Sequence, residues 1–181
     1  MNDLNYENQD LSGCDFTNKD LRYANFRNCN LSGCDFRKSN LSYANICGAN
    51  LFGCSLENAV LDNIVFDKNT KFFEMRCPTT GAFLGYKKCY NNRIVQLLIP
   101  ADAKRTSSTY HACRCDKAKV LTIKSIDLKE SYSEASSYVD DLFVYKVGEY
   151  CYADNFNEDR WVDSTTGIHF FMSREEAIGY L

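Results

Sequence analysis

The sequence lacks a long apolar run. Nowhere do its 181 residues reach the ~18 consecutive apolar side chains that a membrane-spanning helix needs, so we expect no such helix. It also lacks an excess of positive charge, with 24 Asp and Glu against 21 Lys and Arg. That balance argues against direct nucleic-acid binding, which depends on neutralising phosphates. The opening MNDLNYENQD has neither the basic nor the apolar segment of a secretory leader, so we expect a cytoplasmic protein.

Familiar catalytic motifs are missing as well. Gly81 and Gly85 in GAFLGY are not followed by the Lys-Ser/Thr pair of a phosphate-binding loop. The two histidines, His111 and His169, do not assemble with a Ser/Asp or Cys partner into a recognisable triad. We therefore expect no cofactor, and we favour a non-enzymatic protein.

Ten cysteines are abundant for this length. In a reducing compartment they are expected to remain free thiols, and those of the N-terminal part alternate with Ala, as small apolar fillers do. Potential metal ligands further along are Cys77, Cys89, Cys113 and Cys115, with His111 nearby. The spacing is unlike the paired cysteines, about two to four residues apart, of structural zinc sites, so structural thiols are favoured over a metal site.

One stretch has a strict five-residue period. A large apolar residue returns at every fifth position, preceded mostly by Asp or Asn and, two residues before, mostly by a small residue. The large residues are Leu11, Phe16, Leu21, Phe26, Leu31, Phe36, Leu41, Ile46, Leu51, Leu56, Leu61 and Phe66. This period fits neither a helix nor a flat strand. It predicts a chain that turns a corner every five residues and closes a coil after four corners. LSGCDF at 11–16 recurs at 31–36, which supports a twenty-residue coil.

The pattern resembles the pentapeptide-repeat family, in which Ala, Asp or Asn, and Leu or Phe precede two variable residues. The resemblance implies a short right-handed quadrilateral β-helix over residues 1–68. Residues twenty apart should then stack in interior columns, formed by Cys14, Cys34 and Cys54 and by Phe16, Phe36 and Leu56. Tyr23 and Tyr43 should form an exposed column, which is a candidate contact patch.

From residue 69 the period stops, and residues 69–181 are predicted to be a small α+β domain. We expect strands within 82–86, 94–99, 113–124, 142–152 and 167–172, a loop or short helix at 131–137, and a final helix capped by Ser173. CPTTGAFLGYKKC at 77–89 and FVYKVGEYCYADNF at 143–156 resemble the domain of unknown function that follows pentapeptide repeats in bacterial and phage proteins. That resemblance implies architecture and no activity. Arg160 and Trp161 are further binding candidates, although a single Trp is more typical of a core anchor.

Binding is the leading functional interpretation. A short β-helix offers rigid faces, so we expect a protein-binding scaffold that meets a protein partner, with self-association as one form of that binding. An alternative is a DNA mimic that binds the topoisomerase gyrase, as some pentapeptide-repeat proteins do. Residues 1–68 hold nine acids against six bases, which is a weak charge for a mimic.

A second alternative is enzymatic. Small α+β domains that transfer ADP-ribose, or bind ligands derived from NAD, use an aromatic residue, a His and a carboxylate. Tyr86, His169 and Glu175 match those residue types and are the candidate catalytic residues under this hypothesis.

Overall fold

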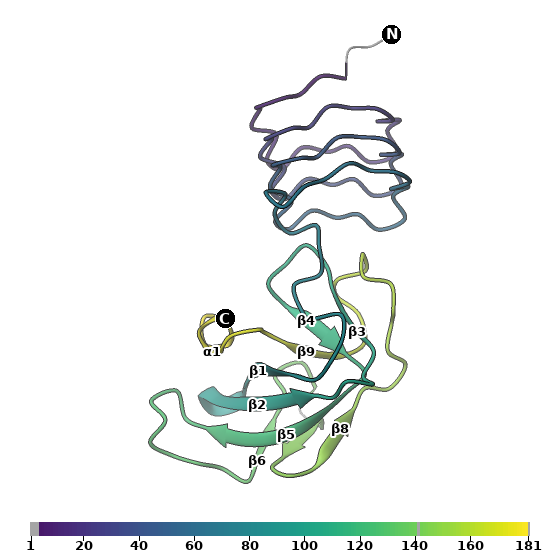
Figure 1. Cartoon of the computed structure of the whole chain (residues 1–181). Coiled ribbons are helices and arrows are strands. Elements are labelled where there is room, and N and C mark those ends of the chain that lie inside the picture. Colours follow the sequence, from purple (N-terminus) through teal and green to yellow (C-terminus); the bar gives the residue numbers. More distant parts are fainter. Residues whose placement is uncertain (1–3, 141, 181) are drawn as a thin grey trace. The chain divides into compact units, whose positions relative to one another are not determined.

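The computed structural model describes residues 4–140 and 142–180, which form two compact units (Figure 1). The first unit contains residues 1–74 together with Ser108–Tyr110 and Trp161–Asp163. The second contains Met75–Ser107, His111–Arg160 and Ser164–Leu181. The division therefore differs from the single boundary expected after residue 68, because two short segments from the C-terminal part of the sequence belong to the first unit.

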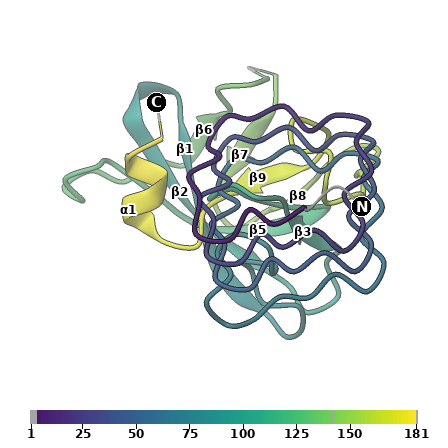
Figure 2. The ribbon, with the colours of Figure 1, turned by 90° about the horizontal axis from the view of Figure 1, so that it is seen from above.

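The first unit is a stack of coils. Parallel bridges join residues twenty apart at successive corners, from Asn5 with Asn25 to Asn45 with Val65. Backbone hydrogen bonds follow the same spacing: the Phe16 N–H donates to the Asp35 carbonyl at 2.8 Å, and the Asp35 N–H donates to the Cys14 carbonyl at 3.0 Å. Seen from above, the coils lie over one another (Figure 2). The five-residue period thus becomes four corners a coil, with every corner paired to the next coil.

The interior of the stack is filled by the two inward positions of the repeat. Large side chains such as Phe26, Phe36 and Leu56 are fully buried, and Ala24, Ala44 and the small thiols fill the space beside them. Phe16 stacks on Phe36 with ring centroids 5.0 Å apart. Cys34 and Cys54 are buried, whereas Cys14 in the first coil is half-buried. Burial of this apolar column is the main source of stability for the unit.

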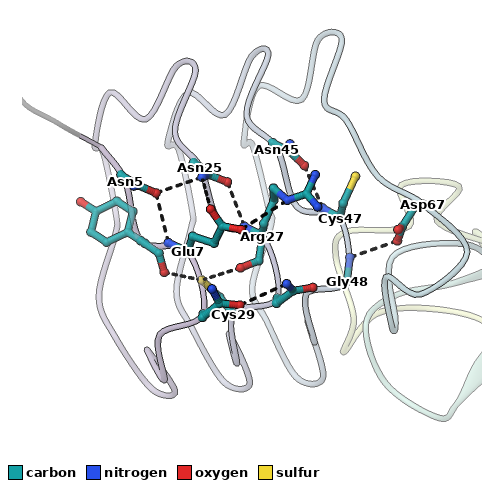
Figure 3. A network of polar contacts seen from close by, with 12 residues as sticks. Asn5, Glu7, Asn25, Arg27, Cys29, Asn45, Cys47, Gly48 and Asp67 are labelled. Atoms are coloured by element: carbon teal, nitrogen blue, oxygen red, sulfur yellow. Dashed lines mark hydrogen bonds and ion pairs between the residues drawn. The ribbon is translucent and has the colours of Figure 1, made fainter.

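The Asp or Asn before each large residue shapes the corner. Its side-chain oxygen accepts the backbone N–H two residues on, as from Thr17 to Asp15 at 2.8 Å and from Arg27 to Asn25 at 3.2 Å. Asparagine amides also donate to the coil above, as from Asn25 to Asn5 at 2.9 Å (Figure 3). Each corner therefore carries its own local bond and, where Asn is present, a bond between coils.

The last turn departs from the strict spacing. Lys71 pairs with Asn50, one residue further than elsewhere, so the expected connector at 71–75 begins as part of the stack. The extra residue is taken up by a turn in which the Asp67 carboxylate accepts N–H groups from Asn69 and Thr70, each at 3.0 Å. The same carboxylate accepts the Gly48 N–H at 3.0 Å (Figure 3).

Two returning segments complete the first unit at this end. Thr109 is buried; its hydroxyl donates to the Cys54 carbonyl at 2.7 Å, and its own carbonyl accepts the Gly53 N–H at 3.1 Å. Trp161 stacks on Phe73, with ring centroids 5.7 Å apart. The Thr109 bonds satisfy backbone groups of the last coil that would otherwise form an open edge, and Trp161 covers apolar surface there.

The second unit is mainly β, with one short helix, so the α+β expectation holds only in part. Its sheets have the strand orders β1-β2-β5-β8, β3-β4-β9 and β6-β7, and every pairing is antiparallel. The strands are β1 Phe83–Cys89, β2 Arg93–Ile99, β3 Arg105–Ser107, β4 Cys113–Cys115, β5 Lys117–Lys124, β6 Glu134–Ser136, β7 Val144–Lys146, β8 Tyr150–Tyr152 and β9 Ile168–Phe170. A 3₁₀ turn, Tyr90–Asn92, joins β1 to β2.

The core of the second unit lies between the sheets. It is built on Val95, Leu97 and Val120 from the four-stranded sheet and on Phe170 from β9. Helix α1 (Arg174–Ile178) begins at Ser173, whose hydroxyl accepts the Glu176 N–H at 3.1 Å as the sequence predicts. The expectation of a loop or short helix at 131–137 was wrong, because β6 pairs there with β7. The strand was not predicted because the segment is rich in serine and only one side chain of the strand, Ala135, is buried.

The cap of the coil stack can be tested at Thr109. We expect Thr109→Val to lower the free energy of unfolding of the first unit by about 1–3 kcal/mol, because the buried Cys54 carbonyl loses its donor. Urea unfolding followed by the fluorescence of Trp161, the single Trp, reports on this unit. Thr80→Val at an exposed position is the control, and equal midpoints for the two variants would contradict the capping role.

The corner carboxylates predict a pH dependence. Hydrogen bonds from the N–H groups of Ser12 and Thr17 lower the pKa of Asp10 and Asp15, so their contribution to stability is present above the unfolded pKa, about 3.8, and is lost as the pH falls through the lower folded pKa. We expect Asp10→Asn with Asp15→Asn to flatten the fall in stability between about pH 5 and pH 3, because Asn keeps the acceptor and does not titrate. Urea midpoints across this range measure the slope. Asp62→Asn, away from the corner position, is the control, and an unchanged slope in the double variant would contradict the assignment.

Candidate functional site

The corners of the coil stack require an unusual backbone. One residue in most five-residue turns lies in the left-handed region, and at these positions the chain uses mainly Asn and Gly: Asn8, Gly13, Asn18, Asn28, Gly33, Gly48, Gly53, Asn58 and Asn63. Three residues depart from that choice, namely Tyr23 at φ 62°, Tyr43 at φ 61° and Lys38 at φ 58°. A bulky side chain is unfavourable in this region, typically by about 1–3 kcal/mol.

The two tyrosines are neither buried nor needed to pack the interior. Tyr23 is 72% exposed and Tyr43 is 48% exposed. Their rings stack on each other with centroids 5.0 Å apart and an interplanar angle of 10°. Because the residues are twenty apart, they occupy the same corner in neighbouring coils, and we call the pair the tyrosine ladder.

The backbone beneath the tyrosine ladder is fixed. The Tyr23 N–H donates to the Ser42 carbonyl at 3.1 Å, and the Tyr43 N–H donates to the Asp62 carbonyl at 2.9 Å. Next to Tyr23, the Arg22 guanidinium pairs with Asp20 at 2.6 Å, and this hydrogen bond lowers the pKa of the Asp20 carboxyl. The ladder is thus an aromatic surface on a rigid backbone with an adjacent ion pair.

The acids of the coil stack are engaged in local structure. Asp10, Asp15, Asp20 and Asp35 each accept the backbone N–H two residues on. Two of these acids also pair with an arginine, the second pair being Asp35 with Arg37 at 2.5 Å. Their negative charge is therefore partly neutralised at the surface, which does not favour a DNA-mimicking rod.

Arg160 and Trp161 have structural contacts. Arg160 Nε donates to the Ser107 carbonyl at 3.0 Å within the second unit, and burial lowers the pKa of its guanidinium. Trp161 packs against the core of the first unit beside Phe73, in the manner of a core anchor. The roles of both residues in binding remain predictions.

The cysteines suggested as metal ligands lie in the core of the second unit. Cys77, Cys89, Cys113 and Cys115 are all buried. The interaction between the Cys77 and Cys113 thiols raises the pKa of Cys113 and lowers the pKa of Cys77, and burial raises the pKa of Cys89 to about 11. Within residues 4–140 and 142–180, no group of three or more His, Cys, Asp or Glu side chains is arranged to hold a metal ion.

The three candidate catalytic residues occupy different surroundings. The Tyr86 hydroxyl accepts from Gln96 Nε2 at 3.2 Å and borders a cavity whose lining includes neither His169 nor Glu175. His169 Nδ1 lies 3.2 Å from the Gly167 carbonyl, and Glu175 is exposed on α1. The ADP-ribosyl-transfer hypothesis gains no support from this arrangement.

The sequence predicted the column of Tyr23 and Tyr43 but not the left-handed backbone conformation of these two residues. The signal was available: the residue two after each large apolar one is usually Asn or Gly, and Tyr interrupts that series twice. The capping segments Ser108–Tyr110 and Trp161–Asp163 carry no periodic pattern, so the sequence offered no signal for them.

Comparison with known proteins agrees with this two-part organisation. A family model described as pentapeptide repeats matches residues 7–37 and 29–67, so this part of the chain consists of pentapeptide repeats. It belongs to the family of unknown function DUF5758, whose model matches residues 73–177, after the repeats. Both resemblances seen in the sequence are confirmed.

Among solved structures, the chain is similar to the crystal structure of a pentapeptide repeat protein, Rfr23, from the cyanobacterium Cyanothece 51142. The identity is 36% over 36% of this chain and 42% of that chain, with a TM-score of 0.21. The match thus spans less than half of that protein's length. No curated protein matches. No helix in the described part of the chain is both long and apolar enough to cross a membrane.

The strain at the ladder can be measured through stability. We expect Tyr23→Asn with Tyr43→Asn to leave the free energy of unfolding of the first unit unchanged or raise it by up to about 1 kcal/mol, because Asn relieves the left-handed backbone while the stacking is lost. Lys38→Asn makes the same change of backbone preference at another corner and is the matched control. Trp161 fluorescence in urea reports the change, and a loss above about 1 kcal/mol would mean that the ladder serves stability.

Proposed function

We propose that this protein is a non-enzymatic protein-binding scaffold whose coil stack presents the tyrosine ladder to a protein partner. The observation that carries the proposal is the placement of two exposed tyrosines at corners where their backbone conformation is unfavourable. Strain that packing does not require is a mark of functional positions. Asn or Gly, used at most equivalent corners, would satisfy the fold without it.

The finer architecture is part of the same proposal. We infer that residues 4–74 form a right-handed quadrilateral β-helix. Four five-residue turns per coil and the twenty-residue spacing of the bridges support this inference. A rigid rod of this kind holds its side chains in fixed positions, so a partner would bind without ordering the surface first.

The chemistry of the tyrosine ladder suits a protein surface. Tyrosine and arginine are enriched among the interface residues that contribute most of the binding energy, because each combines apolar area with hydrogen-bonding groups. The stacked rings of Tyr23 and Tyr43 expose two hydroxyl groups and one continuous aromatic edge, with Arg22 beside them. The expected counterpart is a partner pocket that accepts aromatic rings and offers hydrogen-bond acceptors at its rim.

Capture from a lysate of the source organism tests the proposal. The full chain, the Tyr23→Asn/Tyr43→Asn variant and the Lys38→Asn control are immobilised in parallel, and bound proteins are quantified by mass spectrometry. We expect at least one protein to be enriched by the wild type and the control and to fall by about tenfold or more in the double variant.

The same protein bound equally by all three baits would contradict the role of the tyrosine ladder. A second copy of this chain is one partner that the experiment can identify, and sedimentation of the purified wild type and double variant then checks it. Loss of self-association in the double variant would support the ladder as a contact between copies.

A further inference from the structure

One face of the four-stranded sheet in the second unit is polar and does not pack into the core. The opposite face packs into the core through Val95 and Leu97, and side chains alternate between faces along a strand. On the polar face Tyr86, Gln96 and Thr122 lie in one cross-strand row, because Tyr86 pairs with Gln96 and Gln96 pairs with Thr122. In the next row, Ile94 pairs with Lys124.

These two rows form the floor of a cavity of about 260 Å³. Its remaining lining comes from Leu128, in the turn after β5, and from Arg174 at the start of α1. Arg174 Nη2 donates to the carbonyls of Ser125 and Ile126 at 2.9 and 2.7 Å, so the turn is held to the helix. The cavity is therefore bounded by the sheet and by the turn after β5, which Arg174 holds to α1.

A chain of hydrogen bonds orients the polar groups of the floor. Thr122 Oγ1 donates to Gln96 Oε1 at 3.3 Å, and Gln96 Nε2 donates to the Tyr86 hydroxyl oxygen at 3.2 Å. Since Tyr86 accepts in this chain, its own O–H is left to donate. In the described part of the second unit that proton has no acceptor, and Tyr86 borders the cavity.

The charged groups of the lining are both cations. Lys124 Nζ has no hydrogen-bond or ion-pair partner among the described residues. The Nε and Nη1 donors of Arg174 also have no hydrogen-bond partner among them. Two acids that follow β5 are engaged: Asp127 accepts from Ser125 Oγ at 2.6 Å, and the Glu130 carboxylate accepts from the Tyr132 hydroxyl. Among the residues that the structure describes, none that lines the cavity is acidic.

We propose that this cavity binds a small organic phosphate. Lys124 and Arg174 would neutralise the phosphoryl group, and the Tyr86 hydroxyl would donate to one of its oxygens. Two cations and an oriented donor match the charge and acceptors of a phosphate dianion better than those of a neutral ligand. Ile94 and Leu128 supply apolar contact for the organic part. The site is separate from the tyrosine ladder, so either proposal can fail while the other stands.

Calorimetric titration of the full chain with phenyl phosphate tests the site. We expect saturable binding of one molecule, at least about tenfold tighter than inorganic phosphate and than phenol, because the first lacks apolar contact and the second lacks charge. Affinity for phenyl phosphate no better than for phenol would overturn the phosphate assignment. Affinity no better than for inorganic phosphate would overturn the organic part.

Variants locate the ligand. We expect Lys124→Gln to weaken phenyl phosphate binding by about tenfold, and Gln96→Glu to weaken it similarly, because a carboxylate would accept the Tyr86 proton and repel the phosphate. Lys119→Gln removes the same charge from the same strand outside the cavity and should bind normally.

Amide NMR spectra of each variant verify folding and show whether phenyl phosphate shifts the resonances of Gln96 and Thr122. No binding by the folded wild type, or equal binding by Lys124→Gln and Lys119→Gln, would overturn the proposal.

Discussion

Backbone hydrogen bonds between residues twenty apart hold each coil of the first unit to the next, and the rest of that unit follows from them. To keep this pairing, every fifth residue must turn a corner, and every corner must satisfy its own polar groups. The Asp and Asn side chains do so locally, while the inward Leu, Phe, Ala and Cys residues fill the interior of the stack. The stack ends where the repeat loses its spacing. Thr109 pairs backbone groups that an open coil edge would leave without partners, and Trp161 covers the apolar end of the column beside Phe73.

The need for a corner at every fifth residue also explains why the tyrosine ladder is unusual. A left-handed corner is easy for Gly and tolerable for Asn, so Tyr at such a corner is a departure that the fold does not need. Stacking between Tyr23 and Tyr43 offsets part of the cost, but the rings remain largely in solvent. A rigid corner that displays aromatic rings fits a binding surface, and this reasoning depends on backbone geometry rather than on exposure alone.

The second unit is organised by the alternation of side chains along its antiparallel strands. Antiparallel strands alternate their side chains, so one face of the four-stranded sheet is apolar and the other carries Tyr86, Gln96, Thr122 and Lys124. Helix α1 packs against β1 on part of the sheet (Figure 2). Lys88 Nζ donates to the carbonyl of Ile178 at 3.2 Å. Beside α1, the polar face forms the floor of a cavity whose described lining contains two cations and no acid. The residues that line it are far apart in sequence and fit no short motif.

By itself, the sequence determined the coil stack, because its period is local: each five-residue unit specifies its own corner and inward pair, and the coil closes by repetition. It also determined the strands around Ile94–Ile99 and Ile168–Phe170 and the start of the last helix at Ser173, which depend on nearby residues. Only the tertiary structure decided that Thr109 and Trp161 belong to the first unit, that Glu134–Ser136 is a strand, and that Arg174 meets Tyr86 at one cavity. Those outcomes depend on contacts between distant residues, whose pairing is set by packing and backbone satisfaction rather than by any pattern in the neighbouring sequence.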